Sequence, residues 1–297
     1  MPRSEPDPTG TSTRSGEGDV GAGLDALDMP VAERRSRTRL AAVLPPLVAL
    51  LALVVLWQAL WATAWLPEYR LPAPLAVWEV FWALVEDGQV WGILWTSVHR
   101  AVLGFAVGIL IATPLGLLVA RVRLVRAAIG PLLIGLQSLP SVAWVPAAVL
   151  WFGLTDAAIY FVVLLGSVPS IANGLVSGID QIDPALPRVG RVLGARRLAA
   201  ARHVLLPAAL PGYLGGLKQG WAFSWRSLMA AELIAISPQL GVGLGTYLSQ
   251  GQAFNDMPVV IAAILLILLV GMGIELLVFR PVERSVLRAR GLAGGLG

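Results

Sequence analysis

Residues 179–207 read IDQIDPALPRVGRVLGARRLAAARHVLLP, and this stretch separates two long apolar runs of the chain. The sequence turns apolar again at Val204-Leu205-Leu206-Pro207. A polar loop between two membrane spans gives a protein on one side of the membrane a surface to bind. The basic residues of the loop are Arg188, Arg191, Arg196, Arg197 and Arg202.

The composition is that of a membrane protein. Apolar residues make up 57% of the chain, charged residues 13%, and the mean hydropathy is +0.75, whereas a soluble domain carries about 25% charged residues. Since about 20 apolar residues cross a bilayer, we predict an all-α integral membrane domain over 39–290 with six spans, or five if the first is only peripheral. The spans are expected at about 41–62, 98–120, 127–152, 157–179, 205–234 and 257–279.

Basic residues gather in alternate loops, and such clusters mark the cytoplasmic side. They precede the first expected span and follow the second, fourth and sixth. This pattern predicts a multi-pass protein of the cytoplasmic (inner) membrane with both termini in the cytoplasm. The pI near 10.1 therefore reflects topology, and we expect no nucleic-acid partner. The clusters are Arg34, Arg35, Arg37 and Arg39; Arg121, Arg123 and Arg126; the loop arginines; and Arg280, Arg284, Arg288 and Arg290.

The segments outside the spans differ in character. Residues 1–38 are expected to be a disordered tail without the pattern of a signal peptide, and 291–297 a C-terminal tail. The outer segment 63–95 contains Trp78, Phe81 and Trp82, which suits a short interfacial helix. The Gly-rich segment 237–256 is expected to be a flexible outer loop.

Six prolines fall inside the expected spans, and each removes a backbone hydrogen bond. They predict either ordinary kinks or discontinuous helices that line a pathway. These prolines are Pro114, Pro131, Pro140, Pro146, Pro169 and Pro211.

The basic loop 180–206 carries signals for a short helix. Asp183-Pro184 and Pro187 favour a helix start, and Gly194 favours its end. Val189, Val192 and Leu193 share one face, as in helices that dock into a groove of a partner. A loop that merely fixes topology is the alternative.

The spacing of this loop resembles a family signature. Gly194, nine residues and Val204-x-Leu206-Pro207 resemble the cytoplasmic loop of ABC importer permeases, in which Glu-Ala-Ala, three residues, Gly, nine residues and Ile-x-Leu-Pro follow one another. Arg188-Val189-Gly190 stands here in place of Glu-Ala-Ala. Over roughly 45–285, further stretches resemble the nitrate/sulfonate/taurine branch. They are Leu71-Pro72-Ala73-Pro74, Ser97-Val98-His99-Arg100 with Gly104-Phe105, Pro140 to Pro146 with Trp151-Phe152-Gly153, Pro207-Ala208-Ala209-Leu210-Pro211 and Ala230-Ala231-Glu232.

The resemblance implies a type I importer-like bundle with a cytoplasmic coupling helix that docks into a separate ATPase subunit. It also implies a second permease copy, expected to be identical, and an extracytoplasmic solute-binding protein. Mg-ATP would bind to the ATPase, and this chain would hold no cofactor. The docking residues are expected to be Arg188, Val189, Gly190, Arg191, Val192, Leu193, Gly194, Ala195, Val204, Leu206 and Pro207.

The sequence offers no chemistry of its own. Lys218 is the one lysine and lacks the preceding glycine of a P-loop, so ATP must be handled elsewhere. Cysteine is absent, and His99 and His203 lie far apart, so no metal site is expected. Gly241-Val242-Gly243-Leu244-Gly245 follows no strand and is not a dinucleotide fingerprint.

Ionisable residues inside spans are costly and invite functional hypotheses. Lys218, Trp221, Trp225 and Glu232 share one helix stripe that should face protein or water, with Lys218 and Glu232 snorkelling at the helix ends. Arg226 either pairs with another helix or lines the path of an anion. The candidate pathway residues are Gln137, Ser138, Ser141, Asn173, Ser224, Trp225, Arg226 and Glu232.

Three further expectations concern neighbouring residues. Gly212, Gly216 and Gly220 form a ridge for close helix packing. Glu275 should pair within the bundle, and a proton-relay role for His99 finds no visible partner.

The solute is expected to be a small anion such as a sulfonate, taurine or nitrate. The alternatives are an ABC permease for another solute such as a thiamine precursor, an ion-coupled secondary transporter, which usually has inverted repeats, and an integral membrane enzyme.

Overall fold

The computed structural model describes residues 39–195 and 197–289, and all regular elements in these ranges are helical. The chain divides into two compact units, 1–56 and 57–297. The tails 1–38 and 291–297 and Arg196, on which the sequence carried expectations, lie outside the described residues. The helices are α2 (Arg39–Ala62), α3 (Pro74–Glu86), α4 (Gln89–Arg121), α5 (Arg123–Ser138), η1 (Ser141–Trp144), α6 (Val145–Phe152), α7 (Asp156–Asp180), α8 (Ala185–Val192), α9 (Arg197–Ala200), η2 (Ala201–Leu205), α10 (Leu206–Ile234), η3 (Pro238–Leu240), α11 (Leu244–Ala253), α12 (Met257–Ile274), η4 (Glu275–Phe279) and α13 (Arg280–Ala289).

The all-α prediction is confirmed for the described residues. Fewer segments qualify as membrane spans than the six expected. Among the described residues, 4 helical segments are long and apolar enough to cross a membrane, or 5 if one bent pair counts as a span. α10 is not among them, because Lys218, Gln219, Arg226 and Glu232 lower its hydropathy. The segments are Leu44–Ala62, Gln89–Arg121, Asp156–Asp180 and Met257–Ala289, with the pair Arg123–Ser138 and Ser141–Phe152.

The segment expected as the span 127–152 is interrupted at Leu139-Pro140, as the alternative of discontinuous helices at the prolines allows. α5 ends at Ser138, and the helical pair on either side of the break is bent by 99°. Pro140 lacks an amide hydrogen and disfavours a helical conformation in the residue before it. Of the other five prolines, Pro146 lies in the first turn of α6. Helices continue past the remaining four, Pro114, Pro131, Pro169 and Pro211.

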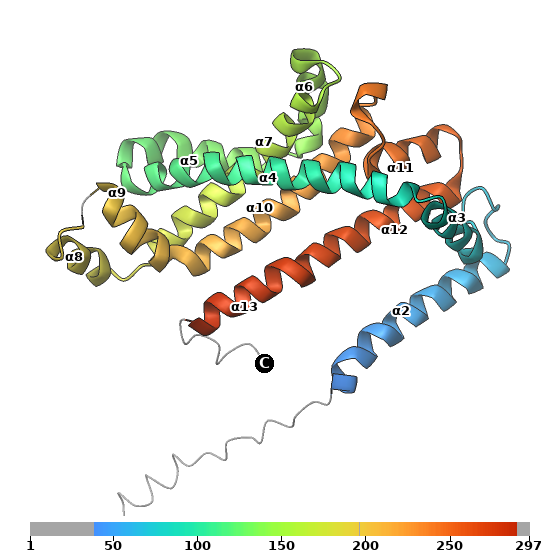
Figure 1. Cartoon of the computed structure of the whole chain (residues 1–297), viewed down its shortest axis with the longest axis horizontal. Helices are drawn as coiled ribbons and strands as arrows, with labels where there is room; N and C mark the ends of the chain where they lie inside the picture. The colour runs from blue at the N-terminus through green and yellow to red at the C-terminus, as the bar shows by residue number, and fades with distance from the viewer. Residues whose placement is uncertain (1–38, 196, 290–297) are drawn as a thin grey trace, which may run out of the picture. The chain divides into compact units, whose positions relative to one another are not determined.

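α7 and α10 approach each other through glycine, as the expected ridge predicts. A Cβ built on Gly216 would lie 2.7 Å from the Cα of Gly174, and one on Gly212 would lie 2.6 Å from the Cα of Gly178. Gly220 packs in the same way against Ile171 of α7. α4, α7 and α10 lie side by side in Figure 1. Small residues allow this approach because no side chain separates the backbones.

The segment after α10 folds into a helix, so the prediction of a flexible outer loop is wrong. η3 and α11 occupy it, and Leu244, Gly245 and Thr246 of α11 are buried. The short helix expected in the segment 63–95 is present as α3, in which Trp78 stacks on Phe81 and on Trp82. α8 and α9 lie at the opposite end of α10 from α11 (Figure 1).

The glycine contact gives a stability prediction. Replacing Gly216 by Val should lower the melting temperature of the detergent-purified chain by several degrees, since overpacking a tight contact costs about 1–3 kcal/mol. Gly215→Val is the matched control, because a Cβ at Gly215 meets nothing within 4 Å. Equal melting temperatures for the two variants would contradict the contact.

Candidate functional site

The basic loop contains a short helix whose two ends are fixed by the residues that predicted them. Asp183 Oδ1 accepts a hydrogen bond from the Ala185 amide at 2.8 Å, just where α8 begins. After α8, Gly194 has φ +83°, and its amide donates to the Arg191 carbonyl at 3.1 Å. The Ala195 amide donates to the Gly190 carbonyl at 2.9 Å. This pair of bonds is a Schellman motif, so the predicted glycine cap is confirmed.

α8 presents an apolar face outward and is fixed on its other side. Val189 is 54% exposed, Val192 87% and Leu193 80%. Gly190 is buried, and a Cβ built on it would lie 2.8 Å from Cγ2 of Val204 in η2. The absence of a side chain at Gly190 therefore lets α8 pack directly on the segment that leads into α10.

Five of the eleven predicted docking residues, Val189, Gly190, Leu193, Val204 and Pro207, line one groove. A cavity of about 440 Å³ lies between α8 and the start of α10. Arg188 and Arg191 are exposed beside it, and Leu206 and Pro207 are the first two residues of α10. The residues lining the groove are Leu186, Val189, Gly190, Leu193, His203, Val204, Pro207 and Ala208.

Four of the eight candidate pathway residues line a second cavity, of about 410 Å³, at the break between α5 and η1. They are Gln137, Ser138, Ser141 and Arg226. Asn173 of α7 joins them indirectly, because its amide donates to Gln137 Oε1 at 2.8 Å. The same Gln137 donates to Ser170 Oγ at 2.9 Å.

Arg226 is the charged group of this cavity. Its side chain is exposed, and its guanidinium lies 5.7 Å from the centre of the Phe223 ring. Over 39–195 and 197–289 the structure shows no carboxylate within ion-pair distance of it. Within the described residues, the alternative of an ion-pair partner on another helix finds no support.

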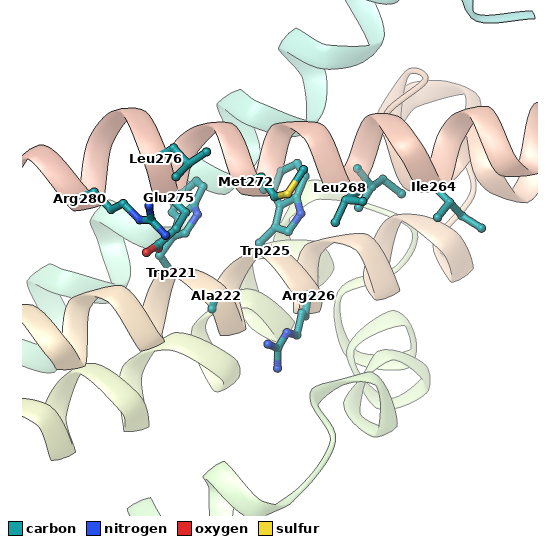
Figure 2. A pocket seen from close by; sticks show the side chains of 12 residues that line it. Trp221, Ala222, Trp225, Arg226, Ile264, Leu268, Met272, Glu275, Leu276 and Arg280 are labelled. Atoms are coloured by element: carbon teal, nitrogen blue, oxygen red, sulfur yellow. The ribbon is translucent and has the colours of Figure 1, made fainter. Parts of the chain in front are cut away.

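The other three candidates do not line that cavity. Ser224 is fully buried, and its hydroxyl has no hydrogen-bond partner. Trp225 is 7% exposed and stacks on Trp221. In Figure 2 Trp225 points toward α12, whereas Arg226 points away from it. A largely apolar groove of about 710 Å³ runs along this α10–α12 seam.

Comparison with known proteins assigns the family. The family model "Binding-protein-dependent transport system inner membrane component" matches residues 104–280. The chain belongs to this family.

Relatives with names agree with that assignment. A protein of Brucella melitensis biotype 1 named as an ABC transporter permease is 31% identical over 74% of this chain and 86% of its own length. A permease of Escherichia coli (strain K12) named for aliphatic sulfonates transport is 31% identical over 74% and 82%. A bicarbonate transport system permease of Synechococcus elongatus is 28% identical over 83% and 90%.

Membership makes this chain the non-catalytic, multi-pass inner-membrane subunit of an ABC transporter. A binding-protein-dependent system has an ATPase and a solute-binding protein as partners, and the family has no cofactor of its own. In the described part of the chain, no three His, Asp or Glu side chains are arranged to hold a metal ion.

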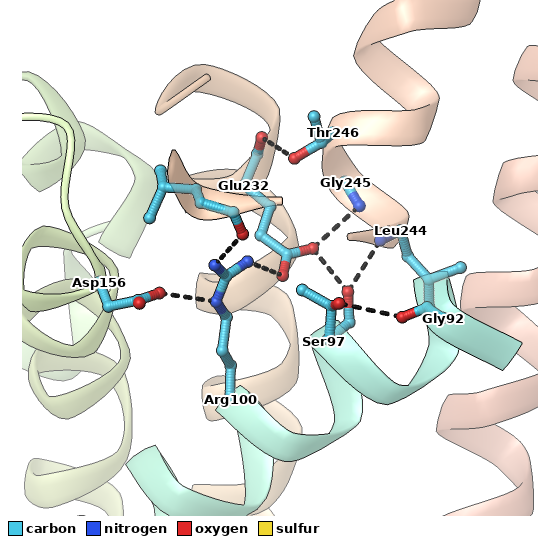
Figure 3. Close-up of polar contacts among 10 residues, drawn as sticks. Gly92, Ser97, Arg100, Asp156, Glu232, Leu244, Gly245 and Thr246 are labelled. Atoms are coloured by element: carbon cyan, nitrogen blue, oxygen red, sulfur yellow. Dashed lines mark hydrogen bonds and ion pairs between the residues drawn. The ribbon is translucent and has the colours of Figure 1, made fainter. Parts of the chain in front are cut away.

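The permease also contains a buried ionic cluster that the sequence analysis missed. Glu232 is 0% exposed, so its expected snorkelling is wrong. Its carboxylate lies 3.2 Å from Arg100 Nη1, accepts from Ser97 Oγ at 2.7 Å and accepts from the Gly245 amide at 3.0 Å. Figure 3 shows these groups converging from α4, α10 and α11.

Arg100 extends the cluster to two more elements. It is 5% exposed, its Nη2 donates to the Leu240 carbonyl, and its Nε lies 2.8 Å from Asp156 Oδ1 at the start of α7. The expected span 98–120 puts Arg100 at the third residue of a span. α4 begins eleven residues earlier, at Gln89, so Arg100 lies well inside the helix.

The glycine run before α11 is explained by this cluster. A Cβ on Gly243 would lie 2.5 Å from Glu232 Oε1, and one on Gly245 would lie 2.6 Å from Glu232 Cβ. Glycine at both positions lets the α11 backbone reach the carboxylate. The sequence did offer a signal for this contact: Glu232 is a charged residue inside an apolar segment, and Gly243-Leu244-Gly245 follows shortly after it.

The remaining titratable candidates have structural partners. Lys218 Nζ lies 2.6 Å from Glu275 and 3.6 Å from Glu283, so the expected pairing of Glu275 is confirmed. Lys218 is 40% exposed, but it lies near the middle of α10 (Leu206–Ile234), so the expectation that it snorkels at a helix end is wrong. The ring of His99 stacks on Trp95 at 5.6 Å.

The cluster predicts a strong contrast between buried and exposed ion pairs. Arg100→Met should destabilise the permease by about 3–5 kcal/mol, because it leaves Glu232 buried without its cation. The double variant Arg100→Met/Glu232→Leu should recover part of that loss. Chemical denaturation of the detergent-purified chain measures both.

Arg126→Gln is the control for this comparison. Arg126 pairs with Asp180 at 2.9 Å, but their side chains are 47% and 42% exposed, and exposed pairs contribute little. An Arg100→Met variant as stable as Arg126→Gln would contradict a stabilising role for the cluster.

Proposed function

We propose that this permease forms, with a second and identical copy, the pathway of an importer for a small anion such as a sulfonate, taurine or nitrate. In this proposal the chain crosses the membrane six times, with the bent α5–α6 pair as the third span and α10 as the fifth. The proposal also places both termini in the cytoplasm and gives the bundle the type I importer architecture.

The observation that carries this proposal is the exposed apolar face of α8 on a helix fixed by Gly190 against Val204. A helix with Val189, Val192 and Leu193 facing solvent is suited to a hydrophobic groove. We propose the ATPase subunit as the owner of that groove. Because α8 packs on the segment leading into α10, closure of two ATPase subunits around ATP would move α8 and α10 together.

The cavity around Arg226 supports an anionic solute. A guanidinium without a carboxylate partner favours a negative ligand, and the hydroxyl and amide groups of Ser138, Ser141 and Gln137 offer further hydrogen bonds. The named relatives serve aliphatic sulfonates and bicarbonate, and both solutes are anions. A cationic thiamine precursor fits this cavity less well, because Arg226 would repel it.

An ion-coupled carrier is the rival function. Such a carrier needs a carboxylate that exchanges ions during the cycle. Two carboxylates of the expected fifth and sixth spans are both engaged: Glu232 with Arg100, and Glu275 with Lys218. Coupling to an ATPase therefore accounts better for the arrangement.

Anion uptake tests the Arg226 cavity. Arg226→Gln should reduce uptake of radiolabelled taurine, nitrate or bicarbonate, whichever the reconstituted wild-type importer carries, by about 10- to 100-fold. That range corresponds to about 1.5–3 kcal/mol for a charge-assisted hydrogen bond. Arg123→Gln, on the exposed first turn of α5, should leave uptake unchanged. Undiminished uptake by a folded Arg226→Gln complex would remove the cavity from the pathway.

Co-purification tests α8. Val192→Asp places a charge at a position that is 87% exposed, so the permease should fold normally but lose the ATPase that elutes with the wild-type chain. Val282→Asp, on an exposed position of α13, should retain it. An unchanged yield of ATPase with Val192→Asp would exclude α8 as the docking helix.

A further inference from the structure

The docking helix carries a charge pattern of its own. From Pro184 to Pro207 the sequence holds five arginines and no aspartate or glutamate. The two acidic residues just before it are already engaged. Asp180 pairs with Arg126, and Asp183 accepts the Ala185 amide at the start of α8. The surface that α8 offers is therefore basic as well as apolar.

Arg188 and Arg191 form one edge of that surface. Both side chains are exposed, and within the described residues neither has an ion-pair partner. Residues three apart are neighbours on a helix. At about 100° per residue, this pair borders the face formed by Val189, Val192 and Leu193 on the side away from Leu193.

We propose that the ATPase groove receiving α8 carries carboxylates that pair with Arg188 and Arg191. This inference rests on the proposed function and adds the charge of the partner to it. The resemblance noted above has a glutamate where Arg188 stands, so the permease reverses the sign at the edge of the docking face. Like charges across an interface select against wrong partners, and the arginines thus set which ATPase this permease accepts.

A protein partner fits this helix better than a lipid surface. α8 lies beyond the ends of α7 and α10, away from the body of the helices (Figure 1). It has eight residues and is thus about 12 Å long. Its buried side, at Gly190, faces η2. Attachment to anionic headgroups is the competing outcome of the experiment.

Zero-length crosslinking tests the proposal directly. A carbodiimide joins a carboxylate to a lysine amine that touches it and leaves arginine unmodified. The chain has one lysine, Lys218, whose amine already contacts Glu275. Arg188→Lys and Arg191→Lys should each add a crosslink between the permease and its co-purifying ATPase, located by mass spectrometry on an aspartate or glutamate. Wild-type chain and Arg123→Lys should give no crosslink that joins a permease lysine to an ATPase carboxylate.

Charge reversal supplies the functional measurement. Arg188→Glu/Arg191→Glu should retain at least tenfold less ATPase at low salt, and reversing the crosslinked carboxylate of the ATPase to arginine should restore it. Binding by the wild-type chain should weaken as salt rises, because exposed charge pairs are screened.

The outcomes separate the two proposals. If Val192→Asp loses the ATPase while the lysine variants do not crosslink and charge reversal has no effect, α8 docks but its arginines do not choose the partner. If Val192→Asp keeps the ATPase, the proposed function fails first. If charge reversal instead abolishes binding of the purified chain to phosphatidylglycerol vesicles and spares the ATPase, the arginines serve the membrane and the inference is overturned.

Discussion

The glycine contact between α7 and α10 is the constraint on which the rest of the molecule depends. Gly174 and Gly178 face Gly216 and Gly212 with no side chain between the two backbones. α8 lies in the connection between these same two helices, so the helices that precede and follow this connection are closely packed against each other. The pair also contributes Asn173 and Arg226 to the groups around the α5–η1 break.

Charge inside the bundle follows a second constraint. Charged groups at membrane depth persist where protein partners replace water, and the permease meets this requirement in two ways. Arg100 and Glu232 form an ion pair. Arg100 also donates to the Leu240 carbonyl, and Glu232 also accepts from the Gly245 amide. Lys218 instead holds Glu275 and Glu283 at the edge of the bundle. Arg226 follows neither pattern, and this exception makes it the candidate for a ligand.

Local signals in the sequence predicted local structure well. Gly194 ended its helix, which depends on residues a few positions apart, and the Gly212–Gly216–Gly220 ridge packed closely, which follows from helix periodicity. The long-range cluster was missed because Arg100 and Glu232 are 132 residues apart. Nothing in the pattern of either helix indicates which charged residue of another helix it meets.

Physical reasons also account for two differences in element assignment. Hydropathy gives the extent of the 127–152 segment, but the prolines left kinks and discontinuous helices as alternatives, and the chain breaks at Leu139-Pro140 because the proline removes a backbone hydrogen bond. The glycines of 241–245 suggested flexibility, but they are required for close approach to Glu232. Four of the eight pathway candidates line the cavity at the break between α5 and η1. Trp225 and Glu232 are instead buried in the interior of the helix bundle.

The break at Leu139-Pro140 has a consequence for hydration. Backbone that leaves a helix at membrane depth has unpaired carbonyl groups, which hydrocarbon cannot satisfy and which persist only beside protein or water. The bend lies beside the guanidinium of Arg226, a group that also keeps its solvation shell unless a ligand replaces it. In the proposed pathway, a solute that enters this cavity would exchange hydrogen bonds to water for hydrogen bonds to the groups lining it.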